Sequence, residues 1–161
     1  MKDESRSFSS CILPPSALMG DAMSDNEFTN ATYTKFLNEH KLMGTRSRAD
    51  GRVYLPPRPI APETQNAEME WVELSGRGKL VAFTIVYVGT SAMIAAGYDR
   101  KNPYCVGVVE LAEGPKTSAQ ILGVDVLHPE QIKIGMPLQA KFVARGEGDA
   151  KKTFLAFEPQ K

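Results

Sequence analysis

Side chains that could act as a nucleophile or as an acid–base pair are present in this sequence, but they do not form a recognisable catalytic set. The candidate nucleophile, Cys105, lies in the apolar run 103–109, where burial raises the pKa of a thiol and lowers its reactivity. We therefore interpret Cys105 as a small buried residue. Two pairs of carboxylates could supply an acid and a base; they are Glu68 with Glu70 and Glu110 with Glu113. No cleft signature accompanies them, so solvation and turn capping are the favoured roles.

The motifs of several enzyme classes are also missing. The sequence contains no Gly-x-Ser-x-Gly elbow and no Walker-type lysine. Its Gly76-Arg77-Gly78 segment leads into a strand-like run and not into a helix, which favours a bulge over a nucleotide loop. A freestanding enzyme is therefore the least favoured function.

Basic side chains point more clearly to binding. They concentrate around residues 46–58 and continue into the first strand-like run; the set is Arg46, Arg48, Arg52, Arg58, Arg77 and Lys79. Arginine suits phosphate and carboxylate groups because its planar fork donates paired hydrogen bonds. A solvated basic face is one interpretation, and contact with an acidic partner surface or with phosphates is the other.

The connection 89–102 is the second candidate binding element. It carries apolar side chains between two expected strands, among them Met93, Ile94 and Tyr98. Apolar residues in such a connection need to be covered. They either fold back on the core or form an interface patch for a partner, and the sequence leaves both alternatives open.

Composition and charge restrict the classes of partner. The chain has 161 residues, of which 19 are basic and 19 acidic. A neutral chain has no net attraction to a phosphate backbone or an anionic bilayer, so nucleic acid and membranes are disfavoured partners. Its two cysteines, Cys11 and Cys105, are too few for a disulfide framework. Because no apolar run has the length of a membrane span and no signal peptide is recognisable, we expect a cytoplasmic protein.

Hydrophobic periodicity predicts a helix near the N-terminus and an irregular segment after it. Apolar residues at helical spacing predict a helix over 28–43. Thr29 or Asn30 is the expected N-cap and Gly44 the expected end. The following residues, 44–70, are rich in proline, which favours a small knuckle or an extended connector.

Residues 71–158 are predicted to be all-β. Strands are expected at 80–88, 104–111, 117–124, 138–144 and 153–157. The first of them is apolar at both alternating positions, which predicts burial on both faces, as in a closed barrel. Short strands in this number favour an OB-fold barrel, although an SH3-like barrel or a small sandwich fits the count as well.

An ordered set of motifs resembles one known family. The segment Gly51-Arg-Val-Tyr-Leu-Pro-Pro-Arg58 is followed by matching stretches at 73–84, 108–114, 121–124 and 132–137. In this order the set resembles the thiolase-associated zinc-ribbon/OB-fold family, formerly grouped as a domain of unknown function. The resemblance covers about residues 30–158, and it implies a helix, a rubredoxin-like zinc ribbon and an OB-fold barrel.

The chain departs from that family at the metal site. Family members carry two Cys-x-x-Cys knuckles, and their positions are occupied here by Ser47 and Asp50 and by Ala61 and Thr64. A structural zinc needs a full set of nitrogen or sulfur ligands, so we predict a degenerate ribbon without metal. Rigid prolines, and packing on the barrel or on a partner, would offset the lost metal.

Single-stranded nucleic acid is the alternative ligand. OB barrels bind it with exposed aromatic side chains and basic surroundings. The strand aromatics of this chain alternate in patterns that look internal; they are Phe83, Tyr87, Phe142, Phe154 and Phe157. Together with the neutral charge, this pattern disfavours the alternative.

These features predict a mainly β chain with an N-terminal extension at 1–27, a helix and degenerate ribbon at 28–70, and an OB-fold domain at 71–161. The extension is typical of a flexible tail or of an arm that orders on a partner. The resemblance implies a non-catalytic accessory subunit that stabilises a thiolase-like or hydratase-like enzyme in a hetero-oligomer. It also implies contact with coenzyme A thioesters through that partner. The residues expected to bind the partner or coenzyme A are Arg46, Arg52, Tyr54, Pro57, Arg58, Arg77, Lys79, Met93, Ile94 and Tyr98.

Overall fold

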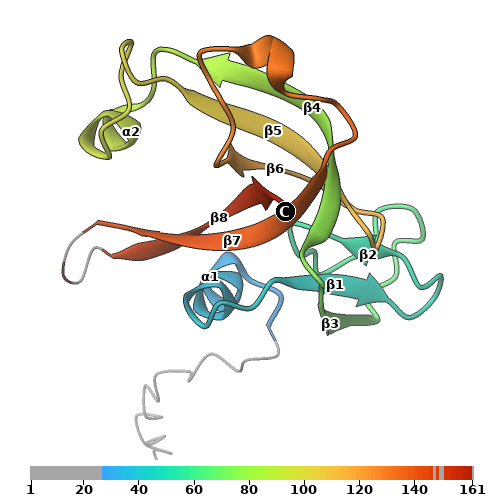
Figure 1. Cartoon of the computed structure of the whole chain (residues 1–161). Helices are drawn as coiled ribbons and strands as arrows, with labels where there is room; N and C mark the ends of the chain where they lie inside the picture. The colour runs from blue at the N-terminus through green and yellow to red at the C-terminus, as the bar shows by residue number, and fades with distance from the viewer. Residues whose placement is uncertain (1–26, 147, 149–150, 161) are drawn as a thin grey trace, which may run out of the picture.

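The chain folds into a small sheet beside a closed barrel (Figure 1). The computed structural model describes residues 27–146, 148 and 151–160, so the predicted extension at 1–27 lies almost wholly outside the described residues. The N-terminal part contains α1 (Asn30–Asn38), β1 (Met43–Ser47), β2 (Val53–Tyr54) and β3 (Met69–Glu73). The barrel part contains β4 (Arg77–Val86), α2 (Ser91–Ala95), β5 (Tyr104–Leu111), β6 (Lys116–Ile121), the 3-10 helix η1 (Pro129–Gln131), β7 (Pro137–Arg145) and β8 (Lys152–Pro159). None of the helices in this described part has the length and apolarity needed to cross a membrane.

The barrel has the strand order of an OB-fold. Around its circumference the order is β4-β5-β6-β8-β7. Strand β4 pairs with β5 and, at its start, with β7, where Gly78 lies opposite Leu138. Strands β6 and β8 are parallel, with Gln120 opposite Ala156. The prediction of a mainly β chain with an OB-fold barrel is confirmed, and the SH3-like and sandwich alternatives are wrong.

A bulge in β4 explains why its apolar residues occupy both alternating positions. The pairing with β5 shifts register between Leu80 and Ala82. Leu80 is buried before the shift, whereas Phe83 and Ile85 pack against the core after it and Thr84 is exposed. An extra residue in a strand swaps the positions that point inward. The prediction that this strand is buried on both faces is therefore wrong.

Helix α1 begins where predicted but ends earlier. Its N-cap is Thr29, whose side-chain oxygen accepts a hydrogen bond from the N–H of Thr32 at 3.2 Å. The helix ends at Asn38 because His40 has a φ of 60°, a left-handed conformation that cannot continue it. Gly44, the expected end, instead lies in β1, where a Cβ would stand 2.9 Å from a carbonyl oxygen of β2.

Residues 44–70 form a ribbon with two knuckle-like turns. Strand β1 lies between β2 and β3 in the small sheet. In the first turn the N–H of Gly51 donates to the carbonyl of Ser47 at 2.8 Å, and in the second the N–H of Gln65 donates to the carbonyl of Ala61 at 2.8 Å. Gly51 and Gln65 share a positive φ, 72° and 51°. The backbone thus has the repeated turn expected of a zinc ribbon, at the positions predicted to have lost their cysteines.

The ribbon and the barrel share one hydrophobic core. Leu42, Leu55 and Leu74 come from the N-terminal part and belong to the same buried cluster as Leu80 and Phe157 of the barrel. Burying a leucine or phenylalanine side chain stabilises a fold by about 1.5–3 kcal/mol. Apolar packing on the barrel therefore holds the ribbon in place.

Gly76 and Gly78 lie where the chain enters the barrel, and of the two alternatives that the sequence suggests here, a bulge or a sharp bend, the structure has the bend. Gly76 has a φ of 70°, and a Cβ there would stand 2.7 Å from the Cβ of Ala140. A Cβ on Gly78 would stand 2.7 Å from the carbonyl oxygen of Glu110. Glycine at these positions lets β4 approach β5 and β7 closely enough for both to pair with it.

Replacing Gly78 by alanine is expected to destabilise the chain by about 1–3 kcal/mol, because the backbone of Glu110 cannot move aside as a side chain can. Chemical denaturation measures the change in the free energy of unfolding. Ser118→Ala, at an exposed position of β6, is the control and should stay within about 0.5 kcal/mol of the native chain. Equal stability of both variants would contradict this role of Gly78.

Candidate functional site

Two of the ribbon arginines share one carboxylate. The guanidinium of Arg46 lies 3.9 Å from Glu70, and that of Arg48 lies 3.2 Å from the same side chain. Both pairs are solvent-exposed, so each contributes little to stability. Their consequence is electrostatic, because Glu70 offsets part of the positive charge that the sequence places here.

Arg52 and Tyr54 connect the two knuckles. Arg52 lies 3.6 Å from Asp50 in the first knuckle and 3.4 Å from Glu63 in the second. The hydroxyl of Tyr54 donates to Glu63 at 2.6 Å. This hydrogen bond raises the pKa of Tyr54 to about 12 and holds the pKa of Glu63 below its usual value. The side chains predicted to bind a ligand are thus engaged inside the ribbon.

The knuckle positions do not offer a ligand set for zinc. Ser47 and Ala61 are fully buried, and Asp50 supplies the one carboxylate among the four positions. The backbone N–H of Arg52 donates to Asp50 at 3.2 Å and lowers the pKa of that carboxyl. Within the described ranges, no three His, Cys, Asp or Glu side chains gather as metal ligands do. The absence of zinc remains a prediction, and the chemistry of these positions fits it.

Pro57 and Arg58 lie on the chain that leaves β2. The backbone N–H of Arg58 donates to the side-chain oxygen of Thr45 at 2.9 Å, which ties this segment to β1. Pro57 is half-buried, and the Arg58 side chain is exposed. Among the residues that the structure describes, its guanidinium has no ion pair.

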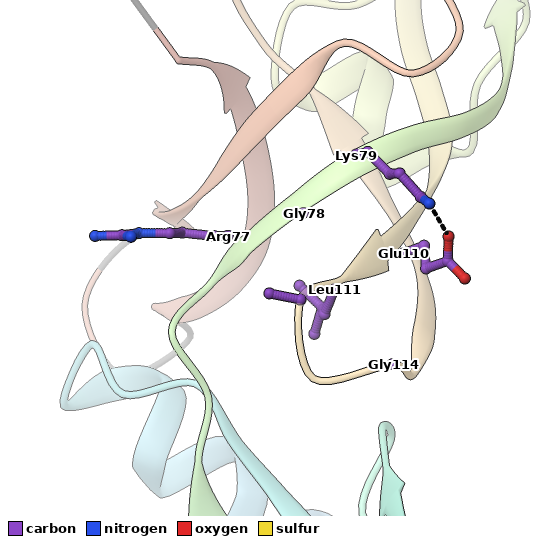
Figure 2. Close-up of a pocket in the computed structure, with 7 residues that line it drawn as sticks. Arg77, Gly78, Lys79, Glu110, Leu111 and Gly114 are labelled. Carbon is purple, nitrogen blue, oxygen red and sulfur yellow. Dashed lines mark ion pairs between the residues drawn. The ribbon is translucent and has the colours of Figure 1, made fainter.

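A pocket of about 440 Å³ lies at the start of β4, beside the turn that joins β5 to β6. Lys79 forms an ion pair with Glu110 at 2.9 Å, and this contact holds the pKa of the carboxyl below its usual value. Figure 2 shows Arg77 extending away from that pair. No carboxylate in the described part of the chain pairs with Arg77, so its charge is available whereas that of Lys79 is offset.

The connection between β4 and β5 divides its apolar residues between the protein and the solvent. Met93 and Tyr98 are half-buried, and the Tyr98 ring lies 5.2 Å from that of Tyr104. Ile94 is 56% exposed, and no residue of α2 is buried. Both alternatives left open by the sequence are therefore realised, because part of the segment folds back and part faces outward.

Two aromatic side chains that look internal in the sequence are exposed. Tyr87 is 49% and Phe154 is 44% exposed, so this part of the prediction is wrong, whereas Phe157 is fully buried. Tyr87 follows the last residue of β4, and Phe154 alternates along β8 with Leu155 and Phe157, which pack into the core. Phe154 lines a second pocket together with Arg145 and Lys152, residues that sequence reasoning did not single out. In the sequence, the only sign that Arg145 and Lys152 could belong to a site is their position on either side of the turn expected after the strand 138–144.

The candidate catalytic groups are inert in the fold. Cys105 is 1% exposed, and burial raises the pKa of its thiol to about 11. Glu113 accepts a hydrogen bond from the backbone N–H of Ser75 at 2.7 Å, and Glu110 is paired with Lys79. These carboxylates have the structural roles expected of them.

The predicted binding residues fall in three separate places. Arg46, Arg52, Tyr54, Pro57 and Arg58 belong to the ribbon. Arg77 and Lys79 lie at the start of β4, and Met93, Ile94 and Tyr98 lie in or beside α2. The fold therefore does not bring them into one site, and the exposed α2 region and the unpaired cations are the parts free to bind.

Comparison with known proteins gives matches across both parts of the chain. A family model described as "ChsH2, C-terminal OB-fold domain" matches residues 71–143. A "DUF35 domain-containing scaffold protein" of Methanocaldococcus jannaschii is 33% identical over 102 residues, which are 63% of this chain and 67% of that protein. The "Benzoylsuccinyl-CoA thiolase subunit BbsA" of Thauera aromatica is 33% identical over 82 residues, 51% of this chain and 52% of that subunit. A solved "Ltp2-ChsH2(DUF35) aldolase" is similar in structure, with a TM-score of 0.64 at 25% identity over 86% of this chain and 97% of that chain.

Replacing Glu63 by glutamine is expected to loosen the ribbon, because Arg52 and Tyr54 lose their shared carboxylate. The amide protection factors of Ala61 and Gln65, measured by hydrogen exchange, should fall roughly two- to fivefold at neutral pH. Because the pKa of Glu63 is lowered in the fold, its contribution is present at neutral pH and disappears as the pH falls through that value. The amide protection factors of the native chain and of Glu63→Gln should therefore become equal at acidic pH.

Glu68→Gln is the matched control, since Glu68 is exposed and forms no described ion pair. Unchanged protection in Glu63→Gln, or an equal loss in both variants, would contradict a specific role of Glu63.

Proposed function

Since this chain belongs to the DUF35 family of scaffold proteins, we propose that it is a non-catalytic accessory subunit of a thiolase-type acyl-CoA enzyme complex. Its role is to bind the enzyme subunit and stabilise its active shape. A hydratase-like enzyme is the closest alternative partner.

Two relatives support this class of partner. One is a scaffold protein by its description, and another is a subunit of a benzoylsuccinyl-CoA thiolase. The similar solved structure combines a ChsH2 DUF35 chain with Ltp2 in an aldolase. Because a fold alone does not determine a function, the surface residues of this chain provide the remaining support.

The observation that carries the proposal is the exposed apolar surface around α2. It comprises Tyr87, Val88 and Ile94, which are 49%, 67% and 56% exposed. We call these three residues the α2 surface. Tight packing of Gly89 against Met93 keeps the segment compact, so the three side chains sit on a defined structure. Large apolar side chains exposed within one connection are candidates for an interaction site.

The state of the chemically active side chains supports a non-catalytic role. Cys105 is buried with a raised pKa, and in the described residues it has no histidine or carboxylate hydrogen-bonded to it. Among the described residues the one His–carboxylate pair, His128 with Asp125 at 2.8 Å, is exposed on the connection between β6 and β7. Catalysis would then belong to the partner.

Purification of the tagged full chain from its native cells, followed by mass spectrometry, identifies the partner. A thiolase-type or hydratase-type enzyme in stoichiometric amount is the expected result. Recovery of the chain alone, or with single-stranded nucleic acid, would overturn the proposal. The exposed Tyr87 and Phe154 make nucleic acid the alternative to exclude.

Ile94→Asp is expected to weaken binding to that enzyme at least about tenfold, because it places a charge in the centre of an apolar contact. The dissociation constant is measured with the purified enzyme. Ile60→Asp is the matched control, because Ile60 is 51% exposed but lies in the ribbon. A larger loss of affinity for Ile60→Asp than for Ile94→Asp would show that the interface lies on the ribbon and not at α2.

Direct contact with coenzyme A is a finer part of the proposal. Arg58 and Arg77 are the predicted cations without an ion pair in the described residues, so they are the best placed for its phosphates. Arg77→Met in the assembled complex should weaken coenzyme A binding about three- to tenfold by calorimetry. Arg46→Met should cause a smaller loss, because Glu70 already offsets its charge. Equal affinities in both variants and the native complex would argue against direct contact.

A further inference from the structure

The second pocket lies where OB-fold barrels commonly bind ligands. It has a volume of about 740 Å³ and is lined by α2 and by the ends of β7 and β8. Helix α2 belongs to the connection between the first and second barrel strands, and β7 and β8 are the fourth and fifth. These two connections flank the binding face of OB-folds. Figure 1 shows α2 at the same side of the barrel as the end of β7 and the start of β8.

Arg145 is the central polar group of this pocket. Its guanidinium donates to the side-chain oxygen of Gln120 and to the sulfur of Met93, the latter at 3.2 Å. It also lies over the ring of Phe154, 5.4 Å from the centroid. All three partners are neutral, so they fix the orientation of the guanidinium without offsetting its charge.

No described carboxylate lies within ion-pair distance of Arg145, which is half-buried. Lys152, on the same pocket, likewise has no ion pair with the part of the chain that the structure describes. Arg46 and Arg52 of the ribbon differ, because Glu70, Asp50 and Glu63 pair with them. A partly desolvated cation that is held rigidly and lacks a counter-ion is prepared to receive an anion.

The remaining wall of the pocket is aliphatic. Ala92, Met93, Ala95 and Ala96 line it on the α2 side. Apolar lining with a few fixed polar groups is typical of small-molecule sites. A bare anion would leave this wall uncovered, and a neutral apolar molecule would leave Arg145 without a counter-ion.

We propose that this pocket binds an amphiphilic anion, that is, a phosphate or carboxylate head group carried on an aliphatic chain. The head group contacts Arg145 and Lys152, and the aliphatic chain lies along α2. Arginine can donate two parallel hydrogen bonds to either head group, so the chemistry common to both defines the ligand class.

Isothermal titration of the isolated full chain tests the proposal with hexyl phosphate and hexanoate, alongside inorganic phosphate and hexanol. Hexyl phosphate, hexanoate or both should bind at least about tenfold more tightly than inorganic phosphate and hexanol. Only the amphiphiles can pair with Arg145 and Lys152 and also cover the aliphatic wall along α2. The two amphiphiles compared with each other identify the preferred head group. Amide NMR shifts should change at Met93, Arg145 and Phe154.

Arg145→Met should weaken binding roughly tenfold, the loss expected for a hydrogen bond to a charged group. Lys152→Met is a second variant that keeps the test decisive if Arg145→Met unfolds. Lys133→Met, at an exposed position of the connection between β6 and β7, is the control and should bind as the native chain does. Equal binding of all four compounds, or equal loss in Lys133→Met and Lys152→Met, would overturn the proposal.

This site goes beyond the proposed accessory function, because its test needs neither a partner enzyme nor coenzyme A. Loss of partner binding in Ile94→Asp with intact amphiphile binding would support the accessory role alone. Amphiphile binding without a partner enzyme would support the pocket alone.

Discussion

Barrel closure through β4 is the constraint on which the rest of the structure depends. This strand pairs with β5 along its length and with β7 at its start; Gly78 permits the close approach of β5, and Gly76 that of β7. Closure places the connection that contains α2 beside the end of β7 and the start of β8. It also supplies the buried surface on which the ribbon packs through Leu42, Leu55 and Leu74. Both candidate binding regions therefore follow from one set of backbone pairings.

The ribbon shows how two knuckle-like turns are held by contacts within the chain. Each of the two turns contains a hydrogen bond from a backbone N–H to the carbonyl four residues earlier, and the donors, Gly51 and Gln65, both have a positive φ. Arg52 and Glu63 join the knuckles at the surface, while Leu55 anchors the segment in the core. Exposed ion pairs are weak, so apolar burial provides most of the stabilisation and the charged contacts select the conformation of the turns.

Charge pairing separates the cations that stabilise the chain from those that are available for binding. Arg46, Arg52 and Lys79 face carboxylates of the same chain. Within the described part of the chain, the partners of Arg145 are all neutral, and it lies in a pocket with an aliphatic wall. A cluster of arginines in the sequence is therefore a weaker sign of an anion site than a single arginine whose partners carry no charge.

The sequence by itself determined the barrel strands and the burial of Cys105 and narrowed the N-cap to Thr29 or Asn30, because strand alternation, capping and apolar context are local properties of the chain. It also determined the family, through the order of its motifs. Only the tertiary structure decided that Tyr87 and Phe154 are exposed, since strand pairing in the barrel sets where β4 ends and which face of β8 is turned to the core. It alone decided which cations are paired, because Glu63 and Glu70 meet their arginines across the ribbon sheet and its turns. Arg145 and Met93 are 52 positions apart, and pairings over such separations depend on barrel closure, which no window of sequence contains.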